Sequence, residues 1–187
     1  CLVWTNDSKN VYYVTKDDTL REFRVMLHEF ETDFKKDKLI FEESDETFYV
    51  SVGKTKDKKY ILINSASSLE SEYRYIDAQH CSDQVFLFQS RVENLEYYID
   101  HKDQEWVIRT NKIGPNFGMM RCPDQHTEMD YWKNIIPYNE SILVEDFELF
   151  KDYLVLSERS EGILKIHVHP KNSSPYYITF DEEVYTA

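Results

Sequence analysis

The stretch ERSEGILKIHV, residues 158–168, has the pattern of one strand pair, and its recurrence along the chain decides the fold. Aligned with itself, the chain contains four such units. In each unit an aromatic residue follows a polar turn and opens an apolar run, as expected where a tight hairpin leads into a buried strand. Successive aromatic residues are 48, 46 and 47 residues apart, and they are Tyr12, Tyr60, Trp106 and Tyr153.

Four apolar runs recur in every unit. One precedes the run that the aromatic residue opens, and two more begin about 13 and about 28 residues after that aromatic residue. Four strands and about 47 residues per unit are typical of a β-propeller blade. We therefore predict an all-β fold, a β-propeller fragment of about four blades with four antiparallel strands each. The units cover approximately residues 1–46, 47–94, 95–140 and 141–187.

Residues 20–30 are the one place where helical spacing competes with the repeat. Five apolar residues fall there at helical intervals, so a short helix is the alternative. The matching positions of the other three units have strand patterns, and we therefore favour a strand. The five residues are Leu20, Phe23, Met26, Leu27 and Phe30.

Composition and charge limit the functional classes. Aromatic residues make up 15% of the chain, which favours a folded β protein. The net charge of -13 disfavours partners such as nucleic acid and anionic membrane and attracts cations or basic peptides, but simple solubility is the favoured explanation. No run of 18 apolar residues and no signal-peptide pattern are present. Because the sequence starts at Cys1 within an apolar run, we expect a segment of a longer protein.

The cysteines indicate the compartment. Cys1, Cys81 and Cys122 are odd in number and lack the spacing of a disulfide framework, which predicts a cytoplasmic location. Three glycosylation triplets point the other way, but such triplets arise often by chance. They begin at Asn6, Asn139 and Asn172.

Several motifs resemble the amino-terminal β-propeller of one peptidase family. DETFYVSVGKTK at residues 45–56 and LSERSEG at residues 156–162 carry most of the resemblance, together with SEYRYID and LEYYIDH. They resemble the oligopeptidase B (protease II) group of the prolyl oligopeptidase family of serine peptidases. The resemblance runs from end to end, with departures such as Gly118, where a larger polar residue is usual.

The resemblance implies a longer, cofactor-independent cytosolic enzyme that cleaves short peptides after Lys or Arg. A seven-bladed propeller would cap an α/β-hydrolase domain and exclude folded proteins. The implied partners are that catalytic domain, the remaining blades and a basic oligopeptide substrate. A propeller used as a protein-interaction scaffold is the alternative, but the tryptophan contexts WT, WV and WK lack the Trp-Asp signature of such repeats.

Catalytic residues are not expected in this chain. A serine hydrolase of the α/β class presents its nucleophile in a G-x-S-x-G turn. None of the glycines flanks a serine in that pattern, so we predict no catalytic residue, no cofactor-binding residue and no enzymatic activity for the chain alone. The glycines are Gly53, Gly114, Gly118 and Gly162.

Two histidine-containing motifs have a spacing that zinc sites use. His167 and His169 lie on the same side of a strand, and Cys122 and His126 form a second pair in CPDQH. With no third ligand expected near either pair, we predict no metal site. HVH is then a strand surface, and Cys122 is a thiol in a polar loop.

Charged residues supply the remaining candidates. Acidic runs at residues 42–46, 144–148 and 181–183 fall at blade margins, where they either steer a basic peptide or form solvated turns. Arg91 and Arg159 either face a hydrolase domain or pair locally. We favour local pairing, with Glu93 and Glu161 or with neighbouring backbone.

The ring geometry leads to a last expectation. Blades shaped for a seven-fold ring turn by roughly 50° each, so four of them form an open arc. Its apolar ends, near Val3 and Trp4 and near Tyr177 and Phe180, should promote self-association or aggregation. A closed four-bladed ring is the alternative.

Overall fold

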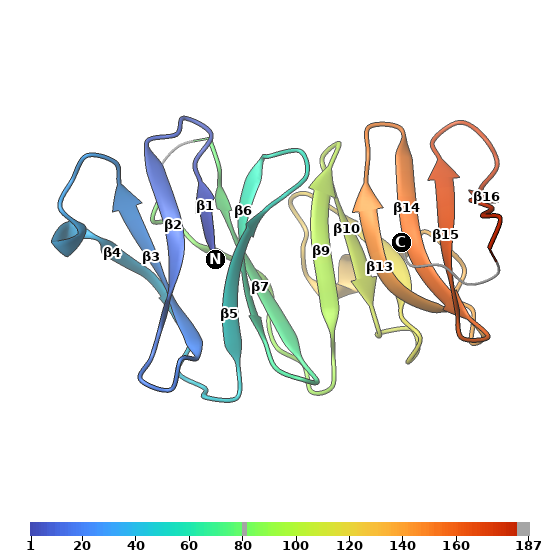
Figure 1. Cartoon of the computed structure of the whole chain (residues 1–187), viewed down its shortest axis with the longest axis horizontal. Coiled ribbons are helices and arrows are strands. Elements are labelled where there is room, and N and C mark those ends of the chain that lie inside the picture. Colours follow the sequence, from blue (N-terminus) through green and yellow to red (C-terminus); the bar gives the residue numbers. More distant parts are fainter. Residues whose placement is uncertain (80–81, 183–187) are drawn as a thin grey trace.

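The chain folds into four antiparallel sheets of four strands each (Figure 1). This computed structural model describes residues 1–79 and 82–182. No helix in these residues is long and apolar enough to cross a membrane. The strands are β1 Leu2–Trp4, β2 Asn10–Lys16, β3 Glu22–Glu29, β4 Lys38–Glu42, β5 Tyr49–Lys54, β6 Tyr60–Ala66, β7 Ser71–Asp77, β8 Phe86–Gln89, β9 Tyr97–Lys102, β10 Glu105–Thr110, β11 Gly118–Pro123, β12 Lys133–Asn134, β13 Leu143–Leu149, β14 Tyr153–Ser160, β15 Ile163–Pro170 and β16 Tyr176–Tyr177.

Each sheet is a meander whose strands follow one another in sequence order. We call the four sheets the first to fourth blades, in chain order. The predicted all-β fold of four four-stranded antiparallel blades is confirmed. Residues 20–30 contribute the strand β3 rather than a helix, while two short 3-10 helices, Phe34–Lys36 and Met129–Tyr131, lie in connecting loops.

Tight hairpins set the register within the blades. In the stretch quoted above, Ser160 pairs with Ile163 across a loop of only Glu161 and Gly162, whose φ angles are 52° and 80°. Two successive residues with positive φ form the turn that matches the right-handed twist of paired strands, and glycine adopts that conformation without steric cost.

The first unit is displaced by two residues from the predicted repeat. The Thr5 N–H donates to the Asn10 carbonyl, and the Thr55 N–H donates to the Tyr60 carbonyl, both at 2.9 Å. These equivalent turns match Asn10 with Tyr60. Tyr12 is instead the third residue of its strand, where it is fully buried.

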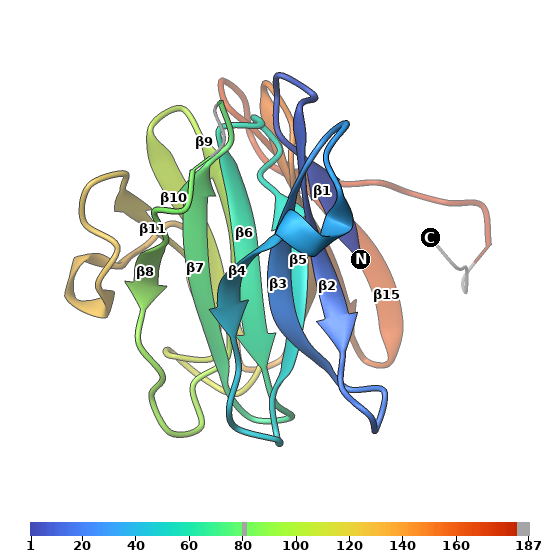
Figure 2. The ribbon, with the colours of Figure 1, turned by 90° about the vertical axis from the view of Figure 1, so that its left-hand side faces the viewer.

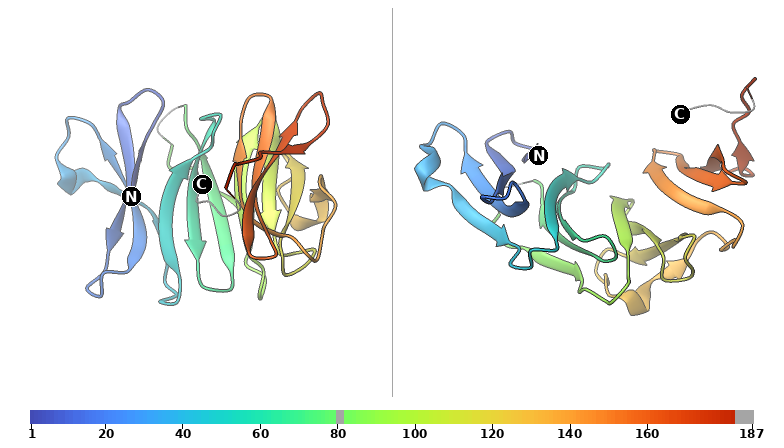
Figure 3. Two further views of the ribbon diagram at one scale, coloured as in Figure 1. Left: turned by 45° about the vertical axis from the view of Figure 1, so that its right-hand side comes forward. Right: turned by 60° about the horizontal axis from the view of Figure 1, so that its bottom comes forward.

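The blades stand side by side around an open arc (Figure 2, Figure 3). The right-hand view of Figure 3 shows the first strands of the blades toward the concave side and the last strands toward the outer side. The first and fourth blades stand apart in the right-hand view of Figure 3, in agreement with the expected open arc.

Three apolar cores among the described residues hold neighbouring blades together. In β6, Ile61 and Ile63 pack in the core shared with the first blade, whereas Leu62 faces the core shared with the third blade. Burial on both faces explains why this strand is a continuous apolar run rather than an alternating one. Met119 and Leu156 belong to the third core, between the third and fourth blades.

Trp106 is the centre of the largest core. Its side chain is fully buried and stacks on Tyr60, with ring centroids 4.9 Å apart and an interplanar angle of 22°. The edges of Phe88 and His101 meet the same indole at 5.1 and 4.7 Å. The second and third blades therefore share one aromatic cluster.

We expect Trp106→Ala to lower the free energy of unfolding by about 3–5 kcal/mol, because it leaves a cavity between two blades. Denaturant unfolding of the 187-residue chain measures this loss. Phe34→Ala is the matched control, since that ring is 72% exposed, and it should change stability by less than about 0.5 kcal/mol. Equal effects of the two substitutions would contradict a central role for Trp106.

Candidate functional site

The concave side of the arc carries acidic groups on innermost strands. The acidic run at residues 144–148 lies in β13, where Asp146 and Glu148 are exposed and a Glu148 carboxylate oxygen lies 2.6 Å from Lys56 Nζ. On β9, Asp100 accepts a hydrogen bond of 2.8 Å from the Lys56 backbone N–H. Burial raises the pKa of Asp100, which therefore holds its charge less readily than the exposed carboxylates.

The acidic run at residues 42–46 divides into two parts, because Glu43 is a buried anchor whereas residues 42 and 44–46 are exposed. Glu43 is 4% exposed, accepts a hydrogen bond of 2.6 Å from Ser65 Oγ and forms an ion pair with Arg91. The Arg91 guanidinium also lies 3.7 Å from the centre of the Phe48 ring. Of the third run, Asp181 and Glu182 are exposed, and residue 183 lies outside the described residues.

The predicted pairing partners of two arginines are wrong. Arg91 pairs with Glu43 rather than Glu93. Arg159 pairs with Glu145, with Nε and Oε1 2.5 Å apart, rather than with Glu161. Its expected bond to nearby backbone is present, because Arg159 Nη1 donates to the Gly162 carbonyl at 2.9 Å.

A buried charged network between the second and third blades has no sequence motif. His101 is 1% exposed, and its Nδ1 lies 2.6 Å from Asp57 Oδ2. Its Nε2 lies 3.0 Å from Asp124 Oδ1 but makes no hydrogen bond there. Burial alone would raise the pKa of Asp124, but hydrogen bonds from Lys59 and Tyr60 outweigh it and lower that pKa. The network joins two blades.

The CPDQH motif is split between a core and a surface. Cys122 is 1% exposed in β11, so the prediction of a polar loop thiol is wrong. Burial raises the pKa of this thiol to about 12, which leaves almost no reactive thiolate at neutral pH. His126 is exposed and stacks on Tyr131, with centroids 4.5 Å apart. Cys1 is exposed, and Cys81 lies outside the described residues.

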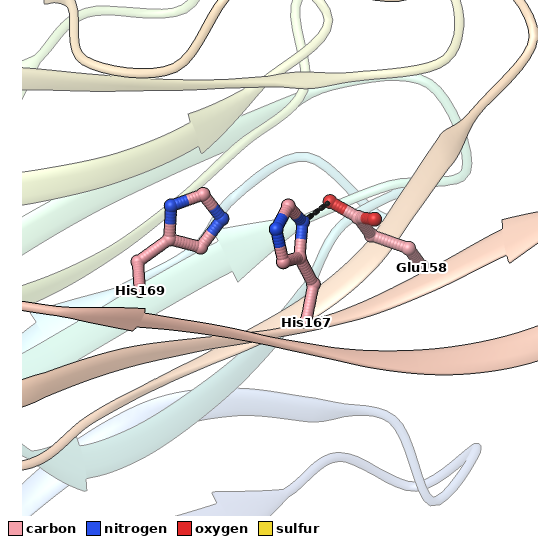
Figure 4. Close-up of side chains that lie close together, drawn as sticks. All are labelled: Glu158, His167 and His169. Carbon is pink, nitrogen blue, oxygen red and sulfur yellow. Dashed lines mark hydrogen bonds and ion pairs between the residues drawn. The ribbon is translucent and has the colours of Figure 1, made fainter. Parts of the chain in front are cut away.

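The HVH motif has a third neighbour that the sequence analysis did not expect (Figure 4). Glu158 Oε1 lies 3.1 Å from His167 Nδ1, and the His167 and His169 ring centroids are 4.0 Å apart. Glu158, His167 and His169 each offer one possible ligand atom, and these atoms lie within 4.8 Å of one another. The argument that no third ligand is near is therefore wrong.

A cavity of about 250 Å³ adjoins this cluster, between the third and fourth blades. Glu158, His167 and Tyr177 supply polar lining, and Phe117 and Met119 supply apolar lining. Tyr177 donates its hydroxyl to Glu158 Oε2 at 2.8 Å. Burial and this carboxylate raise the pKa of Tyr177 to about 12, so the phenol stays protonated.

Gly118 at the edge of this cavity is required sterically. A Cβ atom at this position would lie 2.2 Å from the Ile113 side chain. A larger side chain in its place would require the Ile113 side chain to move.

Comparisons with known proteins give a consistent result. The family model for the prolyl oligopeptidase N-terminal β-propeller domain matches residues 1–187. Dipeptidyl aminopeptidase BI from Pseudoxanthomonas mexicana is 36% identical over 188 residues, covering 99% of this chain and 26% of the relative. Protease 2 from Moraxella lacunata is 29% identical over 183 residues, covering 98% and 26%.

Solved structures share the fold. Oligopeptidase B from Leishmania major superimposes with a TM-score of 0.90 at 23% identity, covering 98% of this chain and 27% of that one. Oligopeptidase B from Trypanosoma brucei, with covalently bound antipain, gives 0.91 at 24% identity, with the same coverage.

The chain spans about a quarter of the length of the curated relatives it matches. The whole of this chain corresponds to propeller sequence, because the family model covers all 187 residues and the strands of each sheet follow the order of a propeller blade. The chain belongs to the prolyl oligopeptidase N-terminal β-propeller family.

Proposed function

We propose that this chain is part of the propeller of a cytoplasmic serine peptidase, in which it filters substrates by size. In the longer protein an α/β-hydrolase domain would carry the nucleophile, and further blades would close the ring. The observation that carries the proposal is the family match over residues 1–187, together with relatives named as a protease and an aminopeptidase.

The blades have the rigidity that a size filter needs. Each pair of neighbouring blades shares an apolar core. Ion pairs add directional contacts, from Glu43 between the first and second blades and from His101 between the second and third. The strands on the concave side cannot move apart to admit a folded protein unless these contacts break. A short flexible peptide passes because it does not require the strands to move apart.

The charge on the concave side supports a basic substrate. Asp146 is exposed on β13, Glu148 on the same strand shares its charge with Lys56, and the whole chain has a net charge of -13. Negative potential raises the local concentration of a cationic peptide. We therefore propose cleavage after Lys or Arg as the activity of the longer protein.

Dipeptide release from an amino terminus is the second candidate. The 36% identity to a dipeptidyl aminopeptidase favours it. The two activities differ chemically, because an aminopeptidase needs a free α-amino group whereas an endopeptidase accepts a blocked one.

A pair of fluorogenic amides separates these activities in the longer protein. We expect hydrolysis of an amino-terminally blocked arginine amide, and none of the folded protein ribonuclease A. The chain of residues 1–187 should hydrolyse neither. Turnover of a free dipeptide amide without turnover of the blocked amide would support the aminopeptidase instead, and cleavage of folded protein would contradict the size filter.

Removal of the concave charges tests the basic preference. We expect Asp146→Asn with Glu148→Gln to lower kcat/KM of the longer protein for a dibasic peptide by about three- to tenfold at low salt, and less at high salt. Kinetics at two ionic strengths measure this effect.

The matched control removes the same charge from the outer edge. Glu128 precedes a short 3-10 helix and Asp130 lies within it, and both are exposed. Glu128→Gln with Asp130→Asn should leave kcat/KM nearly unchanged. Equal losses for both pairs would mean that only net charge matters. For a neutral peptide, kcat/KM should be unchanged by either pair of substitutions.

A further inference from the structure

The three residues of the HVH cluster converge because of strand geometry. His167 and His169 are two residues apart in β15, so their side chains leave the same face of the sheet. On β14, Leu156 pairs with His167, and Glu158 lies two residues further along that face. Its carboxylate therefore reaches the imidazole diagonally.

That face is directed toward the third blade. Leu156 packs with Met119 of the third blade, and Glu158 and His167 line the cavity between the same two blades. The cluster is therefore partly enclosed, and 6% of the Glu158 side chain and 17% of the His167 side chain are accessible.

The polar atoms of the cluster are not fully satisfied by the protein. His169 Nε2 is buried and has no hydrogen-bond partner. An unpartnered buried polar atom costs stability, whereas coordination to a cation would satisfy a nitrogen lone pair. Glu158 supplies the negative charge that compensates such a cation.

We propose that Glu158, His167 and His169 bind a divalent transition-metal ion, with Zn²⁺ as the preferred ion, in the joint between the third and fourth blades. Two imidazoles and one carboxylate form a zinc donor set, and hard cations such as Ca²⁺ and Mg²⁺ prefer oxygen ligands alone. The ligand atoms lie within 4.8 Å of one another, and they would have to draw closer together for an ion to lie about 2.0–2.2 Å from each of them.

The neighbours of the cluster complete the site. The Tyr177 hydroxyl donates to the second carboxylate oxygen of Glu158, and the Tyr177 ring stacks on His167 at 4.1 Å. Such outer contacts orient metal ligands. The adjoining cavity of about 250 Å³ gives the ion a path and leaves space for water as the fourth ligand. Bound there, the ion would fasten β14 to β15.

The experiment titrates metal-free chain in a Cys1→Ser, Cys81→Ser background, which removes thiols that compete for Zn²⁺. A chromophoric chelator reports the Zn²⁺ affinity, and Co²⁺ absorption reports the coordination geometry. We expect one Zn²⁺ per chain with a micromolar or lower Kd, and visible bands typical of four-coordinate Co²⁺. Zn²⁺ at about 100 times Kd should raise Tm by about 5–10 °C.

His169→Asn and Glu158→Gln should each weaken Zn²⁺ binding at least tenfold, and Tyr177→Phe should weaken it by up to about tenfold. His28→Gln is the matched control, because His28 Nδ1 also lies 2.7 Å from a carboxylate, that of Asp37, and it should leave the affinity unchanged. Circular dichroism checks the fold of each variant.

Two results would overturn the proposal. One is an affinity that His169→Asn and Glu158→Gln leave unchanged, which would place the ion elsewhere. The other is a parent chain that, at about 100 μM Zn²⁺, binds no stoichiometric ion and shows no rise in Tm. The three residues would then form only a histidine–carboxylate contact. This second result tests the proposal even if a variant does not fold, because it is measured on the parent chain.

Discussion

Face-to-face packing of neighbouring sheets is the constraint on which the rest of the structure depends. A four-stranded blade cannot bury both of its faces by itself, and β6 shows the consequence, since its alternate residues enter two different cores. The aromatic cluster around Trp106 is the largest of these contacts. The same rule leaves the ends of the arc apolar: Trp4 and Tyr153 are 41% and 45% exposed. Two residues expected at the exposed ends lie elsewhere, since Val3 packs against the core of the first and second blades and Tyr177 lines the cavity between the third and fourth blades.

Polar joints fix how the blades are placed relative to one another. Glu43 with Arg91, and His101 with Asp57, connect groups from different repeat units. At the next joint Arg109 Nε donates to the Val144 carbonyl at 2.8 Å. A buried charge that loses its partner is costly, so such joints select one arrangement over a sliding one. The proposed metal site differs from these joints, because all three of its ligands belong to the fourth blade and only the adjoining cavity is shared with the third blade.

The repeat was predictable because it depends on local order: turns, apolar runs and their spacing determine four-stranded units. The two-residue displacement at Tyr12 was not predicted, because that aromatic residue is a core side chain rather than the residue after the turn. The HVH motif was recognised because its two histidines are close together in the sequence. Glu158 was missed as a third neighbour because its position follows from the register across the Glu161–Gly162 turn. The partners of Arg91 and His101 come from other units, which a linear pattern does not bring together.

The central claim is that these blades keep a wedge shape suited to a larger ring and therefore form an open arc. Small-angle scattering combined with sedimentation, over a range of concentrations, tests it most directly. The account predicts association that grows with concentration through the apolar ends, and, extrapolated to zero concentration, the scattering of an open arc such as that in Figure 3. A concentration-independent monomer of compact, globular dimensions would contradict it, because four blades would then have closed on themselves.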